Sequence, residues 1–227
     1  SSHASVPWQG VNAMYRLTQA LERIESYEPE RDTSANIFDH LSDFAIEHKV
    51  SPENVDQVIS EVRDDQPRLA SMLRALSRMT LTPTIIHGGI KSNSVPEFIQ
   101  LTCDVRTLPH QDLDYVKEQL QNILVDIPGV EFEIDYMAQP NSSPFETEFA
   151  TQIQKATAKA LNINDIKLLP SISNGFTDSR FTRPLGVTTY GYTGAHPDDN
   201  PMLTNSHGTD ESVGIKSLIN STRVMLA

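Results

Sequence analysis

Cysteine and positive charge are both scarce in this chain. The only cysteine, Cys103, can form no disulfide within the chain, so a reducing cytoplasm is the expected location. Eighteen Lys and Arg residues stand against 30 Asp and Glu residues, and the formal net charge at pH 7 is -12. Surfaces that bind nucleic acid or anionic membranes need clustered Lys and Arg, so neither partner is expected. No apolar run is long enough to span a bilayer either.

The chain also lacks internal repeats and low-complexity segments. Its 227 residues, of which 38% are hydrophobic, suffice for one large core or two modest ones. Only residues 139–144, Gln-Pro-Asn-Ser-Ser-Pro, are rich in turn formers over several positions. We therefore predict a domain boundary near Asn141, with one domain over residues 1–140 and a second over residues 141–227.

The first predicted domain alternates between strand and helix patterns. Outside an insertion, the order is strand, helix, strand, strand, helix, strand, over residues 1–7, 11–24, 84–87, 98–106, 111–124 and 130–136. This order is typical of the split βαβ, or ferredoxin-like, fold. Residues 34–80 carry three further helical patterns, one of which starts at Ser51-Pro52, and we interpret them as a helical insertion.

The second predicted domain is also mixed, so the expected class is α/β. Its pattern is a helix, two strands and a last helix, over residues 146–161, 167–169 and 187–192 and from Glu211. Asp178 and Arg180 lie in a glycine-containing loop of this domain, and His207 and Asp210 precede the last helix. Such loops often carry functional groups, but a solvated loop with a helix N-cap is the alternative.

Four short motifs follow one another along the chain. They are Ser2-His3-Ala4-Ser5-Val6-Pro7 with Asn12-Ala13, Ser92-Asn93-Ser94-Val95-Pro96 leading to Asp104-Val105-Arg106, Gly175-Phe176-Thr177-Asp178-Ser179-Arg180, and His207-Gly208-Thr209-Asp210-Glu211. In this order they resemble the motifs of the M20 family of zinc peptidases and amidohydrolases. The third is similar to that family's Gly-Gly-Thr-Asp-Ala-Arg loop, with Phe176 where a second glycine is common.

The resemblance implies a fold and a partner. Residues 1–140 would be a ferredoxin-like βαββαβ dimerisation lid with a helical insertion, through which the protein forms a homodimer. Residues 141–227 would be the C-terminal part of a zinc-hydrolase α/β domain. The segment that precedes the lid in the family has no counterpart here, so we expect the chain to be part of a longer enzyme.

The resemblance also implies two zinc ions per active site in the complete enzyme. The family holds them with a His-x-Asp motif, a bridging Asp, a Glu-Glu pair and one late His. Only the late His has a counterpart, His207, because no His-x-Asp motif precedes the lid and no Glu-Glu pair occurs. We expect Asp210 and Glu211 to cap the last helix and orient His207, and the chain alone to be inactive without a full zinc site.

The remaining site roles follow from the same resemblance. His3 resembles the catalytic lid histidine that reaches the partner subunit's active site and helps to stabilise the oxyanion. Asn93 resembles a substrate-binding asparagine, and Asp178 lies in the substrate-binding loop. Arg106 and Arg180 are both candidates for binding a substrate carboxylate, a choice that stays open. The residues alone also allow exposed ion pairs for both arginines and a turn role for Asn93.

The implied reaction is hydrolysis of the amide bond of a dipeptide or an N-acyl amino acid. In the family a metal-activated water attacks the carbonyl carbon. A non-catalytic dimerisation or ligand-sensing module is the alternative, because ferredoxin-like domains serve many functions. A sensor would need neither the His207 motif nor the loop that contains Asp178 and Arg180.

Overall fold

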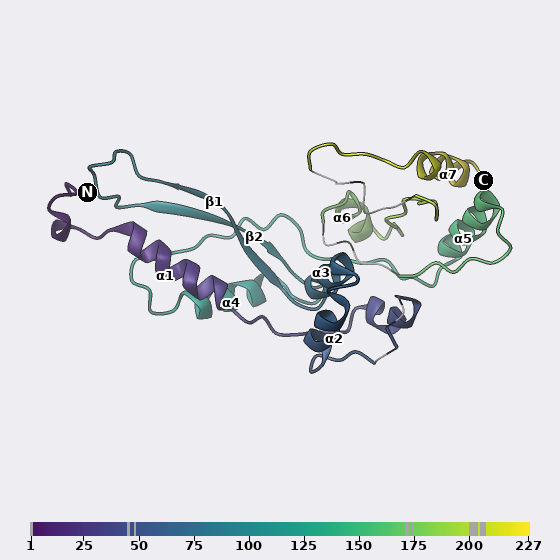
Figure 1. Ribbon diagram of the computed structural model, residues 1–227, viewed down its shortest axis with the longest axis horizontal. Coiled ribbons are helices and arrows are strands. Elements are labelled where there is room, and N and C mark those ends of the chain that lie inside the picture. Colours follow the sequence, from purple (N-terminus) through teal and green to yellow (C-terminus); the bar gives the residue numbers. More distant parts are fainter. Residues whose placement is uncertain are drawn as a thin grey trace. The chain divides into compact units, whose positions relative to one another are not determined.

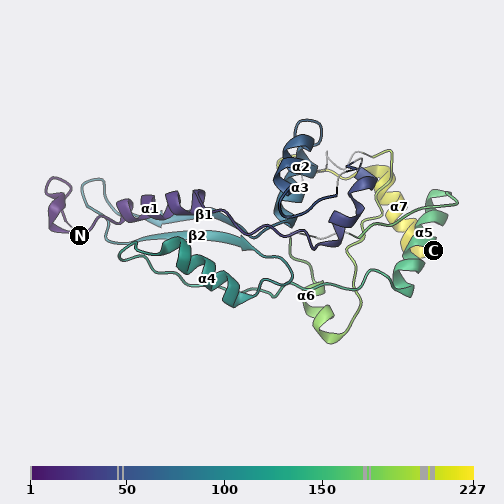
Figure 2. The same ribbon diagram turned by 90° about the horizontal axis from the view of Figure 1, so that it is seen from below.

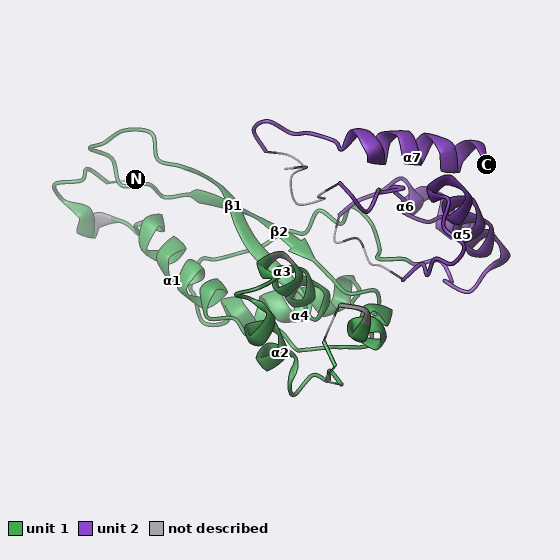
Figure 3. Ribbon diagram, turned by 45° about the vertical axis from the view of Figure 1, so that its right-hand side comes forward, with its two compact units in different colours: residues 1–141 green, residues 142–227 purple. Residues whose placement is uncertain are grey.

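The computed structural model describes residues 2–44, 46–47, 49–170, 173, 175–199, 204 and 208–227 (Figure 1). The chain divides into two compact units, unit 1 (Ser1–Asn141) and unit 2 (Ser142–Ala227), drawn in green and purple in Figure 3. Unit 1 combines helices with a two-stranded sheet, whereas unit 2 consists of helices and extended segments. No helix of the described part is long and apolar enough to cross a membrane.

An antiparallel hairpin organises unit 1. Strand β1 (Thr80–Gly88) pairs with strand β2 (Ile99–Arg106) over the full length of both. The register shifts once, between Pro83 and Ile85, where proline has no backbone N–H to donate to the ladder. Both predicted strands are confirmed, although β1 begins four residues before the predicted start at residue 84.

Side chains along the first half of β2 alternate between exposed and half-buried, as the predicted strand requires. Gln100 and Thr102 are exposed, whereas Ile99, Leu101 and Cys103 are half-buried. Burial raises the pKa of the Cys103 thiol. The cysteine is therefore a neutral, small apolar group on the half-buried face of the strand.

Two helices, α1 (Ala13–Glu25) and α4 (Leu113–Leu124), run alongside the hairpin and contact each other (Figures 1 and 2). Helix α1 also contacts β2. Each helix begins at a side-chain cap, because Asn12 and Asp112 each accept a backbone N–H bond at 3.0 Å. The buried residues of the two helices are Ala20, Val116 and Ile123. Both predicted helices are confirmed.

The segment predicted as an insertion is helical. It contains a kinked 3-10 helix, η2 (Asn36–Phe44), and the helices α2 (Val55–Val62) and α3 (Pro67–Leu76), of which α2 contacts α3. Its buried apolar residues are Ile37, Phe38, Leu41, Ile46, Val50, Val55, Val58, Ile59, Leu69, Ala70, Leu73, Leu76 and Met79. The Leu and Met residues of this segment therefore form a core, with the exception of Met72, which is only half-buried.

The helix start predicted at Ser51-Pro52 is wrong. The N–H of Asn54 donates to the carbonyl of Ser51 at 3.1 Å, and the N–H of Ser51 donates to Oδ1 of Asn54 at 2.7 Å. These two bonds close a turn ahead of the helix. Helix α2 consequently begins at Val55, with Asn54 as its N-cap residue.

The outer strands of the predicted ferredoxin-like order are not strands in the described part of the chain. Residues 2–6 contribute a single bridge, between His3 and Ser94. Val130, Phe132 and Ile134 are half-buried and alternate with exposed residues, as the predicted strand pattern requires, but Tyr136 is exposed and no strand is assigned there. Alternation of exposed and half-buried side chains indicates that one face of a segment is buried, whereas a strand also needs hydrogen bonds to a neighbouring backbone. The mixed α/β class is confirmed, and the ferredoxin-like order stays a prediction.

Unit 2 is built on two helices that contact each other, α5 (Glu148–Leu161) and α7 (Ile215–Leu226). Two short helices lie between them in sequence, α6 (Ser179–Thr182) and η3 (Arg183–Leu185). The predicted helix over residues 146–161 is confirmed as α5, which begins after the N-cap residue Thr147.

Residues 187–192, predicted as a strand, are assigned no strand and pack on α5 through aromatic side chains. The rings of Phe149 and Tyr190 stack with centroids 5.5 Å apart. The hydroxyl of Tyr192 lies 2.6 Å from Oγ1 of the buried Thr157. The strand predicted around residues 167–169 is not assigned either. Side-chain contacts with a helix place these segments without requiring a sheet.

Candidate functional site

His3 is exposed at the end of unit 1 and its ring is oriented by Ser5. Its Nδ1 accepts the backbone N–H of Ser5 at 3.2 Å, and Oγ of Ser5 lies 2.7 Å from the same nitrogen. A backbone N–H can only donate, so Nδ1 is an acceptor and the neutral ring carries its proton on Nε2. The imidazole therefore presents an Nε2–H donor to solvent.

Backbone hydrogen bonds join the segment of His3 to the segment of Asn93. The N–H of Ala4 donates to the carbonyl of Asn93, and the N–H of Val95 donates to the carbonyl of Ser2, both at 2.9 Å. Val95 and Ser2 are buried, 5% and 8% exposed respectively. The structure thus brings together two motifs that are about ninety residues apart in the sequence.

Asn93 itself lies in an exposed turn, in which the N–H of Ser94 donates to the carbonyl of Lys91 at 3.2 Å. This arrangement fits the turn role that the sequence left open, and it also leaves the Asn93 amide at the surface beside the His3 segment. Both interpretations of Asn93 are compatible with this position.

Arg106 is the last residue of β2 and is already engaged. Its Nε lies 2.6 Å from Oδ1 of Asp104, and its Nη2 lies 2.7 Å from Oδ2. The guanidinium is therefore not free for a ligand, because the carboxylate two residues away on the same strand face pairs with it, which is the ion-pair alternative that the residues alone allowed. The pair is partly exposed and contributes little to stability.

Asp178 and Arg180 lie together in unit 2, at the start of α6. Asp178 is exposed and Arg180 is half-buried. The N–H of Arg180 donates to the carbonyl of Thr177 at 3.1 Å, which fixes the backbone of the loop. The Arg180 guanidinium lies over two rings, with its Cζ 5.2 Å from the centroid of Phe176 and 4.6 Å from that of Phe181.

The prediction that Asp210 and Glu211 cap the last helix is wrong. Helix α7 begins at Ile215, after Gly214, and Asp210 lies in the left-handed region with φ of 60°. The cap comes from Asp199, whose Oδ2 accepts the N–H of Ser217 at 2.6 Å. This bond lowers the pKa of Asp199. The sequence did not reveal the cap because Asp199 is well over ten residues from the helix.

His207 lies outside the described residues, and its predicted role as a metal ligand stays a prediction. Among the residues that are described, no cluster of three or more His, Cys, Asp and Glu side chains could hold a metal ion. A catalytic zinc usually has three protein ligands. The described residues therefore do not by themselves fit the zinc pair that the resemblance implies.

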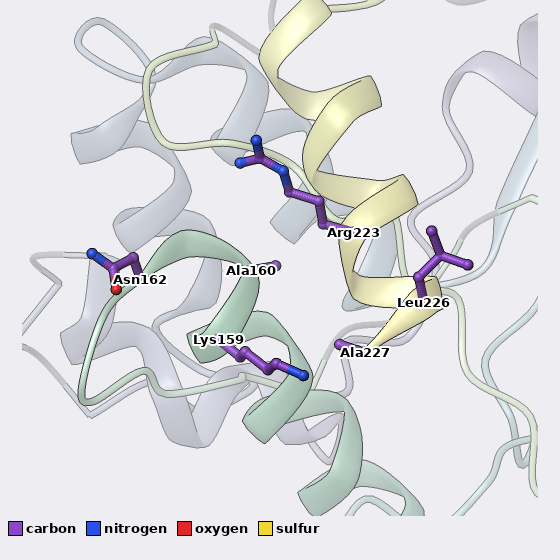
Figure 4. A pocket seen from close by; sticks show the side chains of 6 residues that line it. All are labelled: Lys159, Ala160, Asn162, Arg223, Leu226 and Ala227. Carbon is purple, nitrogen blue, oxygen red and sulfur yellow. The ribbon is translucent and has the colours of Figure 1, made fainter.

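A pocket of about 420 Å³ lies near the C-terminal ends of α5 and α7 (Figure 4). Its lining residues are Lys159, Ala160, Asn162, Arg223, Leu226 and Ala227. The pocket contains none of the side chains predicted for the site. Its two cations counter the negative ends of the helix dipoles, an arrangement that stabilises helices in general.

Sequence reasoning missed Ser5 and Phe181, which contact predicted site residues, and Asp199, which caps the last helix. Ser5 follows His3 by two positions, and serine is known to form short-range bonds of this kind. Phe181 adjoins Arg180 in sequence, so an aromatic residue beside a candidate carboxylate-binding arginine was the available signal. No comparable signal pointed to Asp199.

Comparison with known proteins gives one family and several relatives. Residues 1–129 match the M20 family model described as the peptidase dimerisation domain. A probable succinyl-diaminopimelate desuccinylase from Staphylococcus aureus (strain Mu50 / ATCC 700699) is 26% identical over 166 residues, 72% of this chain and 38% of that protein. Aminoacylase-1B from Rattus norvegicus is 27% identical over 186 residues, 79% of this chain and 44% of that protein. The chain spans less than half the length of these curated relatives.

A solved structure shares the fold. The crystal structure of the M20 family metallo-carboxypeptidase Sso-CP2 from Sulfolobus solfataricus matches with a TM-score of 0.56 and 17% identity, over 98% of this chain and 54% of that chain. At this identity the likeness concerns the fold alone. Because the family model covers more than half of the sequence, the chain belongs to the M20 peptidase family, with residues 1–129 matching its dimerisation domain.

Proposed function

We propose that the chain is part of an M20 hydrolase that cleaves the amide bond of a dipeptide or an N-acyl amino acid. In this proposal residues 1–140 form the lid and residues 141–227 form the C-terminal part of the catalytic domain. The names of the similar proteins, a desuccinylase, an aminoacylase and a carboxypeptidase, support amide hydrolysis. The four motifs of the sequence support the same reaction.

The orientation of His3 is the observation that carries the proposal. Hydrolysis of an amide creates an oxyanion, which N–H donors stabilise when they are already aimed at it. With Nδ1 held by Ser5, the Nε2–H of His3 is such a donor. The amide of Asn93, in the adjoining segment, is a second group that can hydrogen-bond a substrate carbonyl.

Arg180 is the proposed anchor for the substrate carboxylate, and Asp178 belongs to the same loop. A guanidinium and a carboxylate pair through two parallel hydrogen bonds. Arg106 is the weaker candidate, because Asp104 already occupies two of its donors. We therefore favour Arg180 over Arg106 as the residue that binds the substrate carboxylate.

Zinc is the proposed metal, with two ions per active site in the complete enzyme. When bound, it supplies an activated water. Within this proposal His207 is a ligand from this chain, and the others come from further residues of the complete enzyme. The test is the metal content of variants: His207→Ala should lower it, whereas His87→Ala and His110→Ala should not. Unchanged content in His207→Ala would contradict the assignment.

A homodimer formed through unit 1 is part of the proposal. Strand β1 pairs on one side only within the described part, and an unpaired edge can accept a strand from another chain. Ile85 and Ile86 of β1 are exposed by 49% and 54%. Sedimentation equilibrium of the 227-residue chain should give a dimer that Ile86→Lys weakens and the control Gln152→Lys, on α5, does not. A strict monomer at micromolar concentration would oppose the proposal.

The activity is tested with the complete enzyme and N-acetyl amino acids or dipeptides. Loss of one oxyanion donor typically lowers kcat about 10²- to 10³-fold, and we expect His3→Gln to fall in this range. His110→Gln, at another exposed histidine, is the control. Binding of the same compounds without turnover would favour the ligand-sensing alternative. Fractionation of cells would check the cytoplasmic location, which the single cysteine suggests.

A further inference from the structure

The loop ahead of α6 holds one guanidinium over two aromatic rings. The Cζ of Arg180 is 5.2 Å from the centroid of Phe176 and 4.6 Å from that of Phe181. Both distances lie within the roughly 6 Å at which a cation is attracted to the face of a ring. Phe176 precedes Arg180 by four residues and Phe181 follows it directly, so the two rings approach from both directions along the chain.

This contact leaves the hydrogen-bond donors of Arg180 available. A ring face attracts the positive charge as a whole, whereas the N–H groups of guanidinium lie in its plane. The Arg180 side chain makes no hydrogen bond or ion pair with any described residue. Two other arginines differ in this respect. Arg106 donates two hydrogen bonds to the Asp104 carboxylate, and Arg183 donates to the carbonyl of Thr189 at 2.8 Å.

The two rings are also accessible. Phe176 and Phe181 are exposed by 49% and 60%, so neither is a core residue. A flexible arginine loses much side-chain freedom when it binds a ligand, and a contact that orders it beforehand reduces that loss. Phe176 contributes such a contact at a position where the similar family loop commonly has glycine, which has no ring to offer.

We propose that Phe176 is a positioning residue for Arg180. Together with Phe181, its ring holds the guanidinium with its donors directed outward, ready for the carboxylate of a dipeptide or an N-acyl amino acid. The inference rests on the proposed function for the identity of the ligand. The contact between ring and guanidinium is independent of that function and can be measured separately.

The first measurement is spectroscopic and uses the 227-residue chain. Ring currents should displace the Nε–Hε resonance of Arg180, identified by its disappearance in Arg180→Lys. Phe176→Leu, which keeps apolar bulk but removes the ring, should move this resonance, and Phe176→Tyr should retain its position. The matched control is Phe149→Leu, which removes a ring stacked on Tyr190 rather than on an arginine. An unmoved resonance in Phe176→Leu would overturn the inference.

The second measurement is kinetic and uses the complete enzyme. Loss of one partly exposed cation–π contact should raise KM for an N-acetyl amino acid about 2- to 5-fold in Phe176→Leu, with kcat unchanged. Phe176→Tyr should restore KM, and Phe149→Leu should leave it at the wild-type value. A moved resonance with unchanged KM would overturn the positioning role. Unchanged KM in Arg180→Lys would instead refute Arg180 as the carboxylate anchor, which is a failure of the proposed function.

Discussion

At the scale of single residues, small side chains decide which donors the candidate site presents. The neutral imidazole of His3 can carry its proton on either nitrogen, and only one form directs a donor away from the chain. Ser5 selects that form through its backbone N–H and its hydroxyl. A residue two positions along the chain, rather than a distant partner, therefore sets which nitrogen of this histidine carries the proton.

Ser5→Ala should weaken this selection without abolishing it, because the backbone N–H at position 5 remains. Nitrogen-15 spectra of the His3 ring should show the Nε2–H form in the wild-type chain and a mixture in the variant. In the complete enzyme kcat should fall a few-fold, at the level of about one neutral hydrogen bond. Ser26→Ala is the control. A wild-type ring with its proton on Nδ1 would disprove the assignment.

Asp56 is a second residue whose hydrogen-bond partners affect its chemistry, here through its pKa and the stability of the fold. The hydrogen bond from the buried Arg78 lowers the pKa of Asp56, and Arg31 adds to the effect. A carboxylate with a lowered folded-state pKa stabilises the fold above its ordinary pKa of 3.8. This contribution of Asp56 to the unfolding free energy should disappear as the pH falls through its folded-state pKa. Unfolding free energies measured from pH 7 down to pH 2 would reveal this loss.

Asp56→Asn should lower the unfolding free energy at pH 7 by about 1–3 kcal/mol, less than for a fully buried pair because the Asp56 side chain is 37% exposed. The variant should also flatten the acid limb of the pH profile. Asp114→Asn removes an exposed pair with Lys117 and should change stability little. Equal effects of the two substitutions would refute the special role of Asp56.

At the scale of elements, α7 is held by the loop before it rather than by its own first turn. Asn220, only 2% exposed, donates through Nδ2 to the carbonyl of Gly194 at 2.8 Å. Lys216 pairs with Asp198 at 2.5 Å, and Asp199 caps the helix. The loop over residues 193–199 and the helix therefore form one structural element.

Close approach at Gly194 makes this element sensitive to a single methyl group. The residue has φ of +59°, and an added Cβ would lie 2.8 Å from Cα of Ser221. Gly194→Ala should cost about 1–3 kcal/mol of unfolding free energy through steric overlap and backbone strain. Gly191→Ala is a matched control, since a Cβ there meets nothing within 4 Å. Denaturant titration of both variants measures the difference, and equal stabilities would contradict the packing.

At the scale of the whole molecule, the chain offers several candidate substrate-binding residues but only one candidate metal ligand, His207. Its role as a ligand stays a prediction, and one side chain cannot hold two dications. The chain covers 38% of the desuccinylase and 44% of the aminoacylase to which it is similar. The remaining length of such proteins is ample for further ligands.

The 227-residue polypeptide by itself should therefore show no turnover of dipeptides or N-acyl amino acids. Incubation with zinc should not create activity, because the ligands for a metal pair are too few. The complete enzyme, assayed in parallel, provides the positive control. Chelator-sensitive turnover by the 227-residue polypeptide would mean that its residues do build a metal site, contrary to this prediction.

The local elements were predictable because their causes are local. Apolar spacing correctly located α1, α4 and α5, and alternation located β2, since both patterns depend on neighbours within a few residues. The segment over residues 130–136 shows the limit of this reasoning. Half-buried and exposed side chains alternate there from Val130 to Asp135, but strand formation depends on whether another backbone lies alongside, which no local pattern records.

The sequence by itself determined the family, the mixed class and which side chains are candidates for chemistry, because motifs preserve residue types at fixed spacing. The tertiary structure alone decided how those side chains are engaged. In it, backbone hydrogen bonds join the segments of His3 and Asn93, Arg106 pairs with Asp104, and Arg180 lies over two aromatic rings. Hydrogen bonds and ring contacts depend on distances of a few ångströms in space, and these are fixed only when the chain has folded.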